Sequence, residues 1–315
     1  MARFSTEFST RFSAEYPTQF LVEFSTEFCA DAEVFAAAIE PLTSADPVGA
    51  TIVSSALAQQ IAAPYPGTPL MATVRDDKRI RVAALRIPSY PMTAVIDPEI
   101  ADPTRAIDAL AAAVTARSSP ITGVSGRTRT AELLAGACSA RSGQAMVRHM
   151  TLLFYRLEDL VEPVGVPGSP RPANIDDRAD VELLADWFFA FRLETGTGPM
   201  PTGPEPDAVR RGAARGEVFT IWCDDDQPVA AAGHGAVRRG RARIAPVFTP
   251  ENLRQRGYGS AVTAAAVRSA QRRGATEVTL FTDAYHVASN SVYRRLGFAF
   301  VDEFAEFHLG EADSS

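Results

Sequence analysis

The spacing of apolar and polar positions divides the first half of the chain into alternating helices and strands. After Asp31, apolar side chains at Val34, Phe35, Ala38 and Ile39 share one face of a helix. Apolar runs bounded by polar turns predict strands. Besides this first helix, the patterns predict helices over 52–61, 104–116 and 128–140 and strands over 70–75, 80–87, 121–124 and 146–156. Such alternation predicts an α/β (α+β) fold.

The second half of the chain shows the same kind of alternation. Helices are predicted over 177–194, 207–215, 257–273 and 289–296, and strands over 217–223, 228–233, 242–249 and 277–282, followed by a strand pair within 298–309. Residues 161–172, which are rich in proline and glycine, predict a linker. A chain of 315 residues suits two domains. We therefore expect domains over 30–165 and 173–315.

The first residues carry an aromatic side chain at every fourth position. These residues are Phe4, Phe8, Phe12, Tyr16, Phe20, Phe24 and Phe28. A period of four drifts around a helix, and Pro17 interrupts a strand. One interpretation is an interaction arm or a membrane-touching segment. The interpretation that we favour is a low-complexity, poorly ordered extension over 1–29, produced by a translated repeat or an early start codon.

Composition and charge exclude several classes of protein. The net charge of −7 argues against a dedicated nucleic-acid binder. Three distant cysteines and four scattered histidines predict neither a disulfide framework nor a metal site, which suits a reduced, cytoplasmic protein. The longest apolar run, around 109–116, is too short for a membrane span. Arginine in place of lysine and many Ala, Gly and Pro residues suggest a GC-rich, bacterial source.

The segment 243–267 carries the clearest chemical signal. A strand ends at Thr249–Pro250, and the loop Arg254-Gln255-Arg256-Gly257-Tyr258-Gly259 leads directly into a helix. Glycines let a ligand approach the backbone, and the first amides of a helix form an anion site. From Val237 to Arg273 there are nine arginines and one acid, Glu251. This locally basic window favours a phosphate-rich partner.

These residues resemble the GNAT N-acetyltransferase superfamily. The loop is similar to its Arg/Gln-x-x-Gly-x-Gly/Ala pyrophosphate motif, and 280–298 is similar to its second signature, with Asn290, Tyr293 and Gly297-Phe298 in place. The resemblance covers about 173–309, and the whole layout resembles tandem-GNAT predicted acetyltransferases. It implies two GNAT-like domains in tandem, each a mixed sheet flanked by helices. It also implies transfer of an acetyl group from acetyl-CoA to a small-molecule or peptide amine.

The resemblance implies a role for each matching residue. The main chain of Val247, Phe248 and Thr249 would pair with the pantetheine arm as an added strand. Asn290 would contact the same arm. Tyr293 would protonate the departing thiolate, since a phenol with an ordinary pKa near 10 stays protonated until needed; the alternative is a core aromatic residue. The amides that would hold the pyrophosphate are those of Gln255, Arg256, Gly257, Tyr258, Gly259 and Ser260.

Several questions stay open at this stage. The general base could be Glu194, His234, Asp283 or Glu303, or a water relay. In the first domain the corresponding stretch, 97–105, contains two prolines and no glycine, which predicts a degenerate copy that binds no CoA and shapes the acceptor cleft. A non-catalytic acyl-CoA sensor or partner-binding module is the alternative function. The acceptor amine and a homo-oligomeric state stay open.

Overall fold

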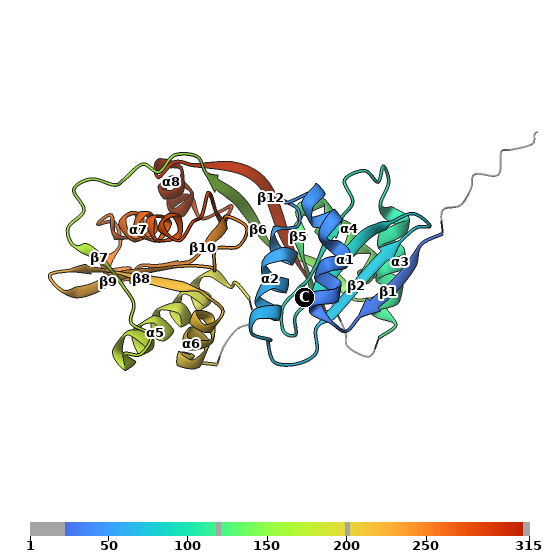
Figure 1. Cartoon of the computed structure of the whole chain (residues 1–315), viewed down its shortest axis with the longest axis horizontal. Coiled ribbons are helices and arrows are strands. Elements are labelled where there is room, and N and C mark those ends of the chain that lie inside the picture. The colour runs from blue at the N-terminus through green and yellow to red at the C-terminus, as the bar shows by residue number, and fades with distance from the viewer. Residues whose placement is uncertain (1–22, 118–120, 199–201, 311–315) are drawn as a thin grey trace, which may run out of the picture.

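One series of strands and helices occurs twice along the chain (Figure 1). The computed structural model describes residues 23–117, 121–198 and 202–310. Its first half contains β1 (Ser25–Cys29), α1 (Ala32–Ala45), α2 (Thr51–Ala62), β2 (Leu70–Arg75), β3 (Ile80–Arg86), β4 (Met92–Ile96), α3 (Thr104–Thr115), β5 (Gly123–Arg127), α4 (Thr128–Ser142) and β6 (Ala145–Leu157). Its second half contains β7 (Ser169–Pro172), α5 (Arg178–Thr195), α6 (Pro206–Ala214), β8 (Val218–Asp224), β9 (Gln227–His234), β10 (Arg241–Phe248), α7 (Tyr258–Arg272), β11 (Glu277–Asp283), α8 (Val287–Arg295) and β12 (Phe298–Gly310). The order of strands and helices is the same in both halves, apart from a short 3-10 turn, Glu251–Leu253, in the second.

The strands of both halves form a single mixed sheet. Its order is β1-β2-β3-β4-β5-β12-β6-β11-β10-β9-β8-β7. The pairs β4–β5 and β10–β11 are parallel, and the other neighbouring pairs are antiparallel. The last strand of each half lies beside the fifth strand of the other half, so β12 pairs with β5 and β6 pairs with β11. The mixed α/β fold class is confirmed, but the predicted ranges 30–165 and 173–315 exchange their final strands.

Four strands differ from the predictions, and one of them, β4, lies where no strand was predicted. The end of the predicted 1–29 extension forms β1, which pairs with β2, and the end of the predicted linker forms β7, which pairs with β8. Both are edge strands, where a proline such as Pro170 need not donate a hydrogen bond. The pair predicted within 298–309 is one long strand, β12, whose two partners, β5 and β6, come from the first half. Residues 1–22, which carry most of the aromatic repeat, lie outside the described residues.

The exchanged strands fill the cores on both sides of the junction. Phe307 and Leu309 of β12 pack in the cluster formed by α3, α4 and the strands of the first half. Tyr155 of β6 packs in the cluster beneath α7 and α8. Between them, Phe304 is fully buried, and its ring contacts those of Phe154 and Phe281. The two halves therefore share one apolar core at β6 and β12.

Helix α5 is held to the edge of the sheet by its first turn. The Asp177 side chain accepts a hydrogen bond from the amide of Ala179, and the left-handed Gly196 ends the helix. The Asp180 carboxylate accepts hydrogen bonds of 2.6 Å from both terminal nitrogens of Arg171 on β7. This bidentate pair holds the pKa of Asp180 below its usual value and ties β7 to α5. None of the described helices has the length and apolar character that crossing a bilayer requires.

Because the halves share their core, truncating Phe304 should destabilise both together. We expect Phe304→Ala to lower the free energy of unfolding by about 3–5 kcal/mol. Far-UV circular dichroism reports the whole chain, whereas both tryptophans, Trp187 and Trp222, lie in the second half. The two signals should change at the same denaturant concentration.

The matched control for this variant is Phe300→Ala, on the same strand, whose side chain is 56% exposed. It should lower stability by about 1 kcal/mol or less. Separate transitions for the two signals would show that the halves unfold independently and would contradict a shared core.

Candidate functional site

Strands β10 and β11 separate part of the way along their length. Their parallel pairing runs from Arg241 opposite Glu277 to Ile244 opposite Leu280 and goes no further. Beyond this point β11 pairs only with β6, and β10 continues beside β9 alone, with an irregularity between Ile244 and Val247. The β11-facing edge of 245–249 thus has no strand partner among the described residues. This open edge can accept an extended ligand as an added strand.

The loop that follows β10 presents a row of unpaired amides. Within the described chain, the six consecutive backbone N–H groups from Gln255 through Ser260 donate no hydrogen bond to backbone or side chain. The backbone is left-handed at Gln255 (φ 63°) and at Gly257 (φ 88°). Helix α7 starts directly after Gly257 and has no side-chain cap. These amides and the positive end of the helix dipole form an anion site.

Side chains around this loop leave the amides accessible while holding the loop in place. Arg254 pairs with Glu194, at 2.6 Å, and its Nε donates to the carbonyl of Thr249. Val166 lies where a side chain on Gly257 would be, at 2.7 Å from that position. A side chain on Gly259 would meet only the Thr249 hydroxyl, at 3.4 Å. There is therefore open space beside Gly259. The Thr249 carbonyl, by contrast, already accepts a hydrogen bond from Arg254 and is not free for a ligand.

Asn290 and Tyr293 both lie on the buried face of α8. The Asn290 amide nitrogen donates to the carbonyls of Asp283 and His286, at 2.9 and 3.0 Å, while its Oδ1 is buried without a partner in the described structure. The Tyr293 ring packs edge-on against Phe298, and no described residue hydrogen-bonds its hydroxyl. Burial raises the pKa of Tyr293 to about 12. Tyr293 thus keeps its proton at neutral pH.

A large cavity, of about 1290 Å³, lies on the other face of the sheet from α7. It is lined by α5, α6 and β10 of the second half and by α1 and α2 of the first. Alternate residues of a strand face opposite sides. Accordingly Ile244 packs beneath α7, while Arg243 and Ala245 line the cavity. The cavity therefore reaches β10 at the place where β10 and β11 separate.

The arginines of the basic window, 237–273, do not all surround the amide loop. The expectation that they mark one site for a phosphate-rich partner was therefore wrong for several of them. Four of the nine arginines line the cavity instead: Arg238, Arg239, Arg241 and Arg243. Arg268 pairs with Glu162, at 2.6 Å. The alternation of a strand separates side chains that are close in sequence, so a positive charge total over the window could not locate a site. Of the remaining arginines, Arg254 and Arg256 belong to the loop itself.

The four carboxylate and histidine candidates for a general base are occupied elsewhere. Glu194 pairs with Arg254, and the Asp283 carboxylate accepts from the amide of Tyr285 in the turn after β11. His234 is buried against Ser269, and burial lowers its pKa. Glu303 accepts from the Thr128 hydroxyl. None of the four lines the cavity, where sequence reasoning missed Glu217, an acid that belongs to no motif.

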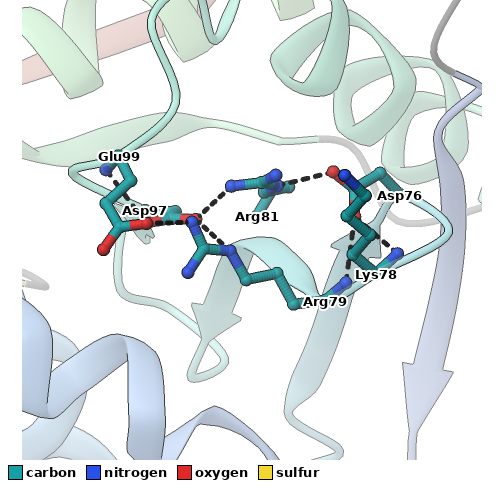
Figure 2. Close-up of polar contacts among 6 residues, drawn as sticks. All are labelled: Asp76, Lys78, Arg79, Arg81, Asp97 and Glu99. Carbon is teal, nitrogen blue, oxygen red and sulfur yellow. Dashed lines mark hydrogen bonds and ion pairs between the residues drawn. The ribbon is translucent and has the colours of Figure 1, made fainter.

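The first half closes the corresponding place with its own carboxylates (Figure 2). Asp97, after β4, pairs with Arg81 at 2.6 Å and with Arg79 at 3.0 Å, and its backbone N–H donates to the Arg81 carbonyl. At the start of α3, the Asp102 carboxylate accepts from the amide of Thr104. The first amide of α3 is thus already engaged by a carboxylate of the chain. That the first half is a degenerate copy which binds no CoA stays a prediction.

Pairing of β6 with β12 also brings His149 close to two residues near the other end of the chain, Glu306 and His308. The ligand atoms of His149, Glu306 and His308 lie within 4.8 Å of one another. The two imidazoles stack with their centroids 4.0 Å apart, and Glu306 pairs with His308. The prediction of no metal site came from the spacing of histidines along the chain. Spacing could not show this arrangement, because the exchange of strands creates it.

The comparisons with known proteins agree with this geometry. Residues 182–298 match the family described as "Acetyltransferase (GNAT) family". A comparison with curated proteins gave no match. Among solved structures, a GCN5-related N-acetyltransferase from Kribbella flavida is 19% identical, with a TM-score of 0.56, and the alignment covers 85% of this chain and 97% of that one.

Two further structures match at low sequence identity. A tandem GNAT protein from the clavulanic acid biosynthesis pathway is 12% identical, with a TM-score of 0.59, and the alignment covers 92% of this chain and all of that one. A GCN5-related N-acetyltransferase from Sphaerobacter thermophilus is 16% identical, with a TM-score of 0.57, and the alignment covers 93% and 98% of the two chains. The chain thus has the fold of a tandem GNAT protein, and its residues 182–298 match the GNAT acetyltransferase family.

Proposed function

We propose that this protein transfers an acetyl group from acetyl-CoA directly to an amine acceptor. The observation that carries the proposal is the row of six unpaired amides at the start of α7, next to the open edge of β10. An anion site beside an open strand edge suits a ligand that joins a pyrophosphate to an extended, amide-containing arm. Coenzyme A has both parts.

The described residues fit such a ligand at three places. The amides of Gln255 through Ser260 would hold the pyrophosphate, with the space beside Gly259 free for close approach. The backbone of Val247 and Phe248 would pair with the arm, while Thr249 contributes less because Arg254 engages its carbonyl. The buried, unpartnered Oδ1 of Asn290 can accept from an amide N–H of the arm.

The chemistry requires a proton donor and a proton acceptor. Acetyl-CoA supplies an acetyl thioester, whose carbon–sulfur bond is replaced by a carbon–nitrogen bond to the amine. The departing sulfur needs one proton, and the amine must lose one. Tyr293 is suited to donate, because its hydroxyl is protonated at neutral pH and is not committed to a partner within the described chain. It shares an apolar cluster with Ile244 and Leu280, where β10 and β11 separate.

The acceptor would enter from the opposite face, through the cavity between the two halves. There Ala245 and Pro246 of β10 line the cavity wall. The first half supplies the wall formed by α1 and α2. We therefore assign the first half to acceptor binding rather than to a second CoA site, in keeping with the Asp102 carboxylate at the start of its α3.

Adding a carboxylate at Gly259 tests the CoA site. We expect Gly259→Glu to weaken acetyl-CoA binding at least tenfold, about 1.4 kcal/mol, because the new charge lies at the proposed pyrophosphate position. Folding should be unaffected or slightly favoured, since an acidic side chain in the first turn of a helix is stabilising by about 0.3–1 kcal/mol. Isothermal titration calorimetry and thermal unfolding measure the two effects.

Gly136→Glu is the matched control, because a side chain at Gly136 on α4 meets no atom within 4 Å. It should bind acetyl-CoA as the wild type does. Binding by Gly259→Glu equal to that of the wild type would refute the proposed site.

Removing the Tyr293 hydroxyl tests its role as proton donor. Tyr293→Phe should lower kcat about 10²–10⁴-fold in a thiol-release assay while leaving acetyl-CoA affinity unchanged. Stability should hold, because no hydrogen bond within the described chain is lost. Tyr155→Phe is the control, since it removes another buried, unpartnered hydroxyl from the same cluster.

An unchanged kcat in Tyr293→Phe would remove this residue from the mechanism. Binding of acetyl-CoA by the wild type without acetylation of any amine would instead favour the acyl-CoA sensor.

A further inference from the structure

Two half-buried charges of opposite sign, neither held in an ion pair, lie in the cavity between the halves. Arg243 on β10 and Glu217, just before β8, both line the cavity. In the part of the chain that the structure describes, neither forms an ion pair within 4.0 Å or a side-chain hydrogen bond. Neighbouring Arg241, by contrast, pairs with Glu277 at 3.3 Å. A charge without a partner in a desolvated place is costly for folding, and such charges are typical of functional sites.

A third charge lies beside these two. Arg215 is only 8% exposed, and its Nε donates to the Ala63 carbonyl at the end of α2, at 3.1 Å. Its guanidinium carbon lies 4.1 Å from the centroid of the Tyr65 ring. Arg215 of the second half is thus held in place by the first half. One carboxylate and two guanidinium groups leave this part of the cavity with a net charge of +1.

The environment acts on both unpaired groups in the direction expected of desolvation. Burial raises the pKa of Glu217, although the charges of Arg215 and Arg243 act in the opposite sense. Burial also lowers the pKa of Arg243, although the charge of Glu217 acts in the opposite sense. Both charged forms are therefore destabilised as long as the cavity contains no matching ligand. A ligand with one positive and one negative group would relieve both.

Aromatic side chains form part of the cavity wall. Phe188, Phe219 and Phe154 line it, and Tyr90 of the first half lies at the same cavity. Gly212 leaves room for Glu217, since a side chain there would lie 2.6 Å from its carboxylate. An apolar ligand body with a charged group at each of two points matches this wall.

We infer that the acceptor is an amino carboxylate with an apolar body, such as an apolar amino acid or short peptide, whose carboxylate binds Arg243 and whose amine binds Glu217. The inference rests on the proposed function and names the substrate class of that site. A planar guanidinium matches a carboxylate in two parallel hydrogen bonds. Proton transfer from the bound ammonium to Glu217 would leave the neutral amine that attacks the acetyl carbon, and the raised pKa of Glu217 favours that transfer.

Binding of three probes tests the two charge contacts separately from acetyl transfer. The probes are L-phenylalanine, 2-phenylethylamine, which lacks the carboxylate, and 3-phenylpropanoate, which lacks the amine. A second set consists of leucine and its analogues that lack the carboxylate or the amine. Calorimetry on the full chain should show at least about tenfold tighter binding of the amino acid than of either analogue. In Arg243→Met, the amino acid should bind no more tightly than the amine that lacks the carboxylate. In Glu217→Gln, it should bind no more tightly than the carboxylate that lacks the amine.

Controls separate these effects from damage to the fold. Arg243→Lys keeps the charge and should restore part of the carboxylate preference. Arg210→Met removes an exposed arginine of α6 that lies outside the cavity and should bind all probes as the wild type does. Three outcomes would overturn the inference. The wild type could bind the amino acid and the amine equally, it could bind none of the probes, or the preference for a carboxylate could survive in Arg243→Met.

An acetylation assay separates failure of the inferred acceptor class from failure of the proposed acetyltransferase function. It uses the same probes, together with the dipeptide Phe-Leu and its C-terminal amide. The amino carboxylates should show at least about tenfold higher kcat/KM, and Arg243→Met should lose that ratio while still acetylating the amines. Acetylation of amines without a carboxylate preference would leave the proposed function standing and overturn only the acceptor class.

Discussion

The exchange of β6 and β12 is the constraint on which the rest of this structure depends. Each of these strands pairs with the fifth strand of the opposite half and with the other exchanged strand. The sheet is thereby continuous from β1 to β7, and the rings of Phe154, Phe281 and Phe304 meet at its centre. A linker alone would leave the halves free to move, whereas shared backbone hydrogen bonds and a shared core fix one against the other.

Fixing the halves is what makes the cavity a defined site. Its walls come from helices of both halves, and Arg215 reaches across to the end of α2. The open edge of β10 meets the cavity at Ala245, while the amide loop and α8 lie toward the opposite face. A donor held on one face of the sheet and an acceptor held on the other would therefore meet where β10 and β11 separate.

Local signals in the sequence predicted much of this arrangement. Helix α5, strands β8 to β11 and the loop at Arg254 through Gly259 all follow from periodicity and from glycines placed before a helix. Contacts between distant strands could not be predicted in this way, because the pairing of β6 with β12 joins residues more than 140 positions apart. Strands β1 and β7 were missed because they carry too little apolar patterning. Glu217 was missed for a similar reason: it lines the cavity between the halves, which no spacing along the chain reveals.

The symmetry of the strand order has a consequence for the origin of the chain. Reading the sheet from either end gives the same sequence of equivalent strands, with the exchanged pair at the centre. This is the topology of a two-fold dimer in which each subunit lends its last strand to the other, with residues 158–168 joining what would be separate subunits. In such a dimer both copies would carry the same loop, whereas here Asp102 accepts a hydrogen bond at the start of α3 and the glycine loop precedes α7. Covalent linkage lets the two equivalent halves of one sheet differ in sequence, which two identical subunits cannot do.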